Sequence, residues 1–209
     1  MCLSKRIYMI LFFLLVFLLV GSGCSAEENT GDQPTITKNP DSEYEQTFSD
    51  LNLGVLFHFD FYLPQADNRW VDIWVEKYSD GKMKAEPLIQ LSYGHSPDSV
   101  QEGRLGFGMI NHDTQTPLLF LFAPGMSTEP EVIDKQSDTE TITWNYTIGE
   151  EKTELELGEE ITLAAYREKE GSSIRTEDFQ DEESINRIIE EGDMVMLLKL
   201  KVTEESPEQ

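Results

Sequence analysis

Much of the chain after residue 50 alternates between apolar and polar residues, which is the pattern of β-strands with one buried face. In LNLGVLFHFDFYL, residues 51–63, every second position is apolar, while Gly54, His58 and Asp60 fall on the other face. Eight further segments show a similar strand pattern and are separated by turn residues: 69–78, 83–93, 104–111, 117–123, 140–148, 152–158, 160–168 and 193–202. About nine short strands predict an all-β fold, an antiparallel β-sandwich or an open barrel.

Two local signals add to this picture. Asp80-Gly81 lies between two strand segments and predicts a tight hairpin turn. Ile185, Ile188 and Ile189 share one face at helical spacing, acidic residues precede them, and Gly192 follows. We therefore expect one short helix near 182–191, at an end or edge of the sandwich.

The N-terminus has the pattern of a secretory signal peptide. Lys5 and Arg6 precede an apolar run of 14 residues, 7–20, and the small residues 21–23 follow it. As a helix that run would span about 21 Å, which is too short for a hydrocarbon core of about 30 Å. We expect residues 1–23 to be removed rather than to remain as a membrane span.

The segment Gly21-Ser22-Gly23-Cys24 resembles the lipobox of bacterial lipoproteins. The resemblance implies that Cys24 carries a diacylglyceryl group, becomes the mature N-terminus and anchors the protein to the outer face of the cell membrane. It is confined to about residues 1–24, and the folded domain suggests no known family. The alternative is an ordinary signal peptide cleaved near Ala26, which would release a soluble secreted protein.

Composition divides the rest of the chain into three parts. Residues 24–50 are mostly small, polar or acidic, which predicts a disordered tether. Residues 51–203 hold the strand pattern and are enough for one domain with its own core. Residues 204–209 predict a short disordered tail.

The chain is strongly acidic, with a formal charge of −24. Without residues 1–23, which contain two bases and no acids, the charge becomes about −26. Nucleic acid is therefore excluded as an expected partner, because binding it requires a basic surface. A requirement for solubility explains this acidity no less well than a role in binding does.

Catalytic and metal-binding signatures are absent from the sequence. It contains no GxSxG, HExxH, phosphate-binding loop or CxxC motif, and His58, His95 and His112 lack the spacing of a metal pair. Gly106 and Gly108 indicate a bulged or closely packed strand rather than a nucleotide site. We expect no metal, no cofactor and a non-enzymatic role; a hydrolase that uses carboxylates is the third candidate.

The segment NRWVDIWVEKY, residues 68–78, carries the most informative surface pattern. If its aliphatic residues face the core, the other face carries a stripe of three aromatics and two acids: Trp70, Asp72, Trp74, Glu76 and Tyr78. Such a stripe suits an envelope glycan or a protein partner. Alternatively the tryptophans are covered, and the acids pair with Lys77, Lys82 or Lys84.

Together these patterns predict a lipid-anchored extracytoplasmic protein with a non-enzymatic binding or structural role at the bacterial cell envelope. The alternative function is an envelope-glycan binding module that uses the stripe.

Overall fold

The computed structural model describes residues 31–134, 141–171, 179 and 181–204. The predicted signal peptide, Cys24 and residues 205–209 of the predicted tail lie outside these ranges. The described strands are β1 (Thr35–Lys38), β2 (Gly54–Pro64), β3 (Trp70–Ser79), β4 (Lys82–Met83), β5 (Ile89–Gly94), β6 (Val100–Ile110), β7 (Leu118–Ala123), β8 (Met126–Ser127), β9 (Glu131–Val132), β10 (Thr141–Tyr146), β11 (Thr153–Glu154), β12 (Glu160–Lys169) and β13 (Met194–Thr203). Two α-helices accompany them, α2 (Glu43–Asp50) and α3 (Glu182–Glu191), with one 3-10 turn at Ala66–Asn68.

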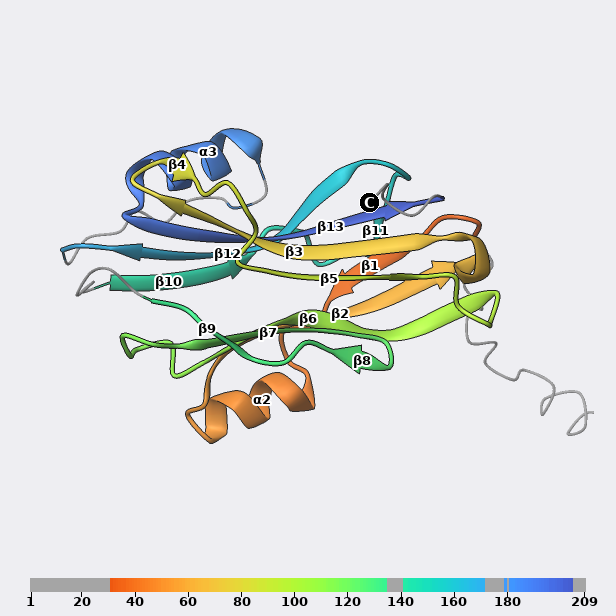
Figure 1. Cartoon of the computed structure of the whole chain (residues 1–209), viewed down its shortest axis with the longest axis horizontal. Coiled ribbons are helices and arrows are strands. Elements are labelled where there is room, and N and C mark those ends of the chain that lie inside the picture. The colour runs from red at the N-terminus through yellow and green to blue at the C-terminus, as the bar shows by residue number, and fades with distance from the viewer. Residues whose placement is uncertain (1–30, 135–140, 172–178, 180, 205–209) are drawn as a thin grey trace, which may run out of the picture. The chain divides into compact units, whose positions relative to one another are not determined.

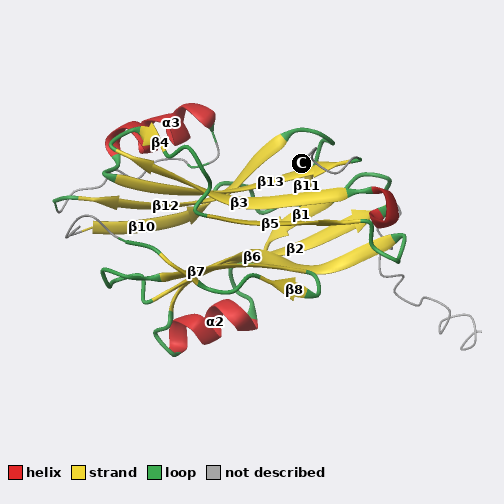
Figure 2. Ribbon diagram, viewed as in Figure 1, coloured by secondary structure: helices red, strands yellow, loops and turns green. Residues whose placement is uncertain are grey.

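The strands form two antiparallel sheets that pack face to face, so the sandwich, and not the open barrel, is the fold (Figure 1). Sheet A has the order β11-β1-β2-β6-β7-β8, with β9 also paired to β7. Sheet B has the order β10-β12-β13-β3-β4, with β5 also paired to β3. One helix lies outside each sheet, α2 over sheet A and α3 over sheet B (Figure 2).

The inner faces of the two sheets supply the main core, as the alternating pattern predicts. Every second residue of β2 from Val55 to Leu63 is buried, and so are the residues of β13 that alternate with Lys199 and Lys201. The predicted hairpin is confirmed: β3 pairs with β4, and both Asp80 (φ 50°) and Gly81 (φ 72°) have positive φ. Two such residues make the type of turn that follows the twist of a hairpin.

The domain begins earlier in the chain than its composition predicts. Residues 35–50, assigned to a disordered tether, form β1 and α2. β1 pairs with β2 on one side and with β11 on the other, and its Ile36 is fully buried. The prediction was wrong here because one buried isoleucine in a short polar strand leaves almost no compositional signal.

The predicted helix at 182–191 is confirmed as α3, and it lies on the outer face of sheet B, over the end where β13 begins and β3 ends (Figure 1). The helix begins at Asp181, whose carboxylate accepts hydrogen bonds from the Ser184 backbone N–H (2.8 Å) and hydroxyl (2.6 Å). Its apolar face packs on the outer face of sheet B, where Ile188 joins a second small core with Val195 and Leu197. Val195 and Leu197, on the outer face of β13, are therefore buried as well as the residues that face the main core.

Candidate functional site

The predicted stripe lies on the outer face of sheet B, on β3. Trp70, Asp72, Trp74, Glu76 and Tyr78 are each partly exposed, whereas the residues between them point into the core. Tyr78 also packs against the small core under α3. The structure therefore brings the five residues onto one face, as predicted, and covers one end of the stripe with the helix.

The acids of the stripe are engaged within the protein. Glu76 accepts hydrogen bonds from Trp74 Nε1 (3.1 Å) and from the Tyr78 hydroxyl (2.8 Å), and Lys199 Nζ lies 3.3 Å from it. Asp72 accepts a hydrogen bond from the Ser92 hydroxyl. The predicted pairing with Lys77 is wrong, because Lys77 points to the other face and donates to the Asp134 carbonyl (3.3 Å).

The three histidines lie on different elements. His58, expected on a polar face, is only 3% exposed and lies beneath Tyr44 of α2 at a ring distance of 5.7 Å. Burial lowers the pKa of His58. His95 lies beside Trp70 and His112 beside Trp144. No group of three or more His, Cys, Asp or Glu residues suited to hold a metal ion occurs in the described part of the chain.

Helix α2 forms one wall of a groove that the sequence analysis missed. It begins at Ser42, whose hydroxyl accepts a hydrogen bond from the Glu45 backbone N–H (3.2 Å). Ser42-x-x-Glu45 is the sequence of a capping box, so a helix signal was present in the segment assigned to the tether. None of the residues of α2 is buried, which leaves its aromatic side chains free to contact a ligand.

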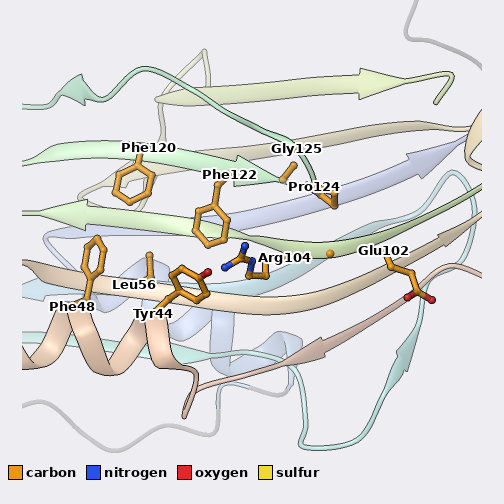
Figure 3. A pocket seen from close by; sticks show the side chains of 11 residues that line it. Tyr44, Phe48, Leu56, Glu102, Arg104, Phe120, Phe122, Pro124 and Gly125 are labelled. Carbon is orange, nitrogen blue, oxygen red and sulfur yellow. The ribbon is translucent and has the colours of Figure 1, made fainter. Parts of the chain in front are cut away.

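The groove lies between α2 and the outer face of sheet A and has a volume of about 460 Å³ (Figure 3). Tyr44 and Phe48 extend from the helix, and Phe120 and Phe122 from β7. The Phe48 and Phe120 rings are 6.1 Å apart, and the Phe120 and Phe122 rings 6.2 Å. An open site with aromatic walls suits a ligand with apolar groups.

Two glycines of β6 make room for the rings of β7. A Cβ atom on Gly108 would lie 2.2 Å from the Phe120 ring, and one on Gly106 would lie 2.5 Å from the Phe122 ring. The register of β2, β6 and β7 is continuous here, so the expectation of a closely packed strand is confirmed and that of a bulge is not. The GFG sequence was therefore a second local signal of the groove, besides the capping box of α2.

Arg104 supplies the positive charge of the groove. Its guanidinium lies 4.1 Å from the centre of the Tyr44 ring, the geometry of a cation–π contact. Among the described residues no carboxylate lies within ion-pair distance of this side chain. Asp60 lies opposite this arginine on β2 but accepts a hydrogen bond from Asn39, and Glu102 also lines the groove. The guanidinium is therefore exposed without an ion pair to a described residue and can bind an anionic group on a ligand.

A polar contact ties α2 to β10 on the other side of the helix. The Tyr146 hydroxyl accepts a hydrogen bond from the His58 backbone N–H (3.0 Å) and donates one to Glu45 (3.2 Å). Burial raises the pKa of Glu45 to about 7, and the hydrogen bond from Tyr146 opposes that shift. The helix is thus held against the end of β10, beside a second cavity lined by Trp144 and His112.

The described residues include no helix that is both long and apolar enough to cross a membrane.

Comparison with known proteins places the folded domain in a family. No curated protein and no solved structure matches the chain. The YgaN domain matches residues 35–202, from the first strand to the end of the last, which corrects the expectation that the domain has no known family. The match also begins at β1, in agreement with the structure and not with a boundary at residue 51. The chain belongs to the YgaN domain family.

Proposed function

We propose that this protein is a lipid-anchored, non-enzymatic binding protein of the bacterial cell envelope. Its groove between α2 and sheet A receives an apolar segment of a partner protein. Cys24 carries the diacylglyceryl anchor, and the domain works outside the cell membrane. The observation that carries the binding role is the groove itself, with its four aromatic side chains and an arginine that forms no ion pair with a described residue.

The anchor is supported by the resemblance of residues 21–24 to a lipobox. Replacing Cys24 with Ala removes the thiol that takes the lipid, so we expect the variant to appear in the medium or to remain as an uncleaved precursor. Fractionation of cells followed by mass determination distinguishes these products from the wild type. Unchanged maturation and membrane retention would instead support cleavage near Ala26 or another mode of attachment.

A protein partner fits the surroundings of the groove. Of the large apolar side chains that are exposed, five lie on α2, directly after it, or on strands of sheet A: Tyr44, Leu51, Val100, Met126 and Val132. Of these side chains, Tyr44 lines the groove itself. Tyrosine and arginine are also enriched among the residues that dominate binding energy at interfaces.

The partner is expected to combine an apolar anchor with a negative charge. Its apolar side chain would contact Phe48 and Phe120, and an aspartate, glutamate or terminal carboxylate would meet Arg104. Arg104 is the only basic side chain among the described residues that line the groove, and charges beyond about 8 Å are screened at physiological ionic strength.

Cross-linking in the native cell tests this proposal. A photoreactive phenylalanine at position 44 projects into the groove, whereas the same group at position 83 lies on the exposed β4 of sheet B. We expect a discrete adduct with one partner from position 44 and none from position 83. Equal adducts from both positions, or none from position 44, would contradict a partner in this groove.

A second candidate is the envelope-glycan module that uses the β3 stripe. One observation favours it: Trp70 and Trp74 are both partly exposed on the same face. The internal hydrogen bonds of Glu76 and Asp72 count against it, because they occupy atoms that would otherwise bind sugar hydroxyls. Replacement of Trp74 with Ala tests whether the stripe binds a glycan, because it removes one of the stripe's two partly exposed indole rings.

A carboxylate-dependent hydrolase receives less support. Glycosidases of that kind use two carboxyl groups on either side of the scissile bond. Glu45 has a raised pKa and lines a cavity, but it is the only acid among the residues that line that cavity. Glu102 is likewise the only acid that lines the groove.

A further inference from the structure

The second cavity, on the opposite side of α2 from Arg104, differs in chemistry from the groove. It has a volume of about 420 Å³, within the range of small-ligand sites. Glu45, Gln46, Ser49 and Asn52 contribute polar groups from α2 and its end, and an aromatic side chain, Trp144, comes from β10. Val55 and Leu56 add apolar surface.

The indole ring of Trp144 is accessible to a ligand in the cavity. It is 44% exposed although it belongs to a β-strand, because β10 is the edge strand of sheet B. His112, from the turn between β6 and β7, meets the indole edge to face at a ring distance of 5.6 Å. The histidine therefore holds the orientation of the indole, and no further closure of the fold is needed to present the ring.

The polar groups opposite are held in place and retain binding capacity. Tyr146 donates to one oxygen of Glu45, which leaves the other carboxyl oxygen available. Gln46 uses its amide nitrogen to bond the Asp41 carbonyl (2.8 Å), so its amide oxygen is available as well. Glu45 and Ser49 are four residues apart and lie on the same side of the helix.

We propose that this cavity binds a neutral pyranose ring of an envelope glycan, which stacks on Trp144 and hydrogen-bonds to Glu45, Ser49 and Asn52. A pyranose has one apolar C–H face and a rim of hydroxyl groups. It therefore needs an exposed aromatic ring next to several fixed hydrogen-bonding groups, and this cavity provides both. The site is separate from the β3 stripe, and the proposal does not depend on the protein partner of the groove.

The charge of the surroundings favours a neutral sugar over an acidic one. The mature chain carries about −26 charges, and no Lys or Arg residue lines the cavity. With a pKa of about 7, Glu45 is partly protonated at neutral pH and can donate as well as accept a hydrogen bond. A hydroxyl group is both donor and acceptor, so it matches such a carboxyl group.

Isothermal titration calorimetry of the full chain in a sugar-free detergent tests the site. The two sugars to titrate are tri-N-acetylchitotriose and cellotriose. We expect saturable binding of at least one of them with one site per chain, and affinity at least about tenfold weaker in Trp144→Ala, as for an aromatic residue that dominates a binding site. The second variant is Ser49→Tyr, at an exposed position of the helix. Its larger side chain should fill the cavity and abolish binding.

Trp74→Ala is the matched control, because it removes a tryptophan from the β3 stripe and leaves the cavity intact. The proposal predicts wild-type affinity for this variant. It is overturned if the wild type binds neither sugar, if Trp144→Ala and Ser49→Tyr both bind as the wild type does, or if Trp74→Ala is the variant that loses binding. Thermal unfolding of each variant establishes that the protein is folded.

Discussion

Removal of residues 1–50 should leave a chain that no longer unfolds cooperatively. The deletion takes away β1, which lies between β2 and β11 in sheet A, and the fully buried Ile36. Loss of a buried isoleucine side chain alone costs about 2–5 kcal/mol, and the exposed edge of β2 adds to this, against a total stability of roughly 5–15 kcal/mol. Chemical denaturation followed by circular dichroism measures the effect.

Deletion of residues 1–31 is the matched control. It keeps β1 and α2, and it keeps Asp32, whose carbonyl accepts a hydrogen bond from the buried Arg69 (2.8 Å). We expect this shorter deletion to unfold in a single cooperative transition. If the chain that begins at Leu51 unfolds with the same midpoint, β1 and α2 are not part of the domain and the boundary near residue 35 is incorrect.

Gly106→Ala should be strongly destabilising. The new Cβ would lie 2.0 Å from the Phe57 carbonyl oxygen of β2, so the backbone of a central strand pair must move. Overpacking of this kind costs about 3 kcal/mol, which for a domain of this size lowers Tm by roughly 6–12 °C. Differential scanning calorimetry measures the shift, and a change below about 2 °C would contradict the packing of β6 against β2.

Gly108→Ala, two residues away, should have a different consequence. The three atoms nearest to its new Cβ all belong to the Phe120 ring, the closest at 2.2 Å, whereas the atom nearest to the new Cβ of Gly106→Ala is a backbone oxygen. Phe120 is partly exposed beside the groove, so its side chain can rotate away at a cost of about 1 kcal/mol. We expect Gly108→Ala to have nearly wild-type stability but a groove of different shape. Gly106 would then be required for the stability of the fold, and Gly108 for the shape of the groove.

The sequence predicts those parts of the fold whose signal is local. All nine predicted strand segments contain strands, although β11 takes up only two residues of 152–158, and α3 occupies the predicted residues, because the segments are long enough to show a period. β8 and β9, like β1, were missed because two to four residues show no period. The packing of α3 on the outer face of sheet B was not predicted, because the alternating pattern indicates only one buried face for β13, whereas residues 195–198 are apolar on both faces.

The candidate site was harder to predict because its parts are distant in the sequence. Tyr44 and Phe48 lie in a segment whose average composition hides a helix, and they meet Phe120 and Phe122 only in the folded protein. The stripe on β3 was visible because its five residues are consecutive on one strand face. Whether Glu76 and Asp72 can bind a ligand depends on their contacts with Lys199 and Ser92 from neighbouring strands. The sequence of β3 alone does not predict these contacts.

The central claim is that a partner binds in the groove between α2 and sheet A. The most direct test is to repeat the cross-linking from position 44 in cells that carry Gly108→Ala. The new Cβ would lie 2.2 Å from the Phe120 ring, so we expect the substitution to displace this ring at the wall of the groove. We expect the adduct to disappear while the amount of folded protein stays at the wild-type level. An adduct of the same mass and yield in the Gly108→Ala protein would contradict the account.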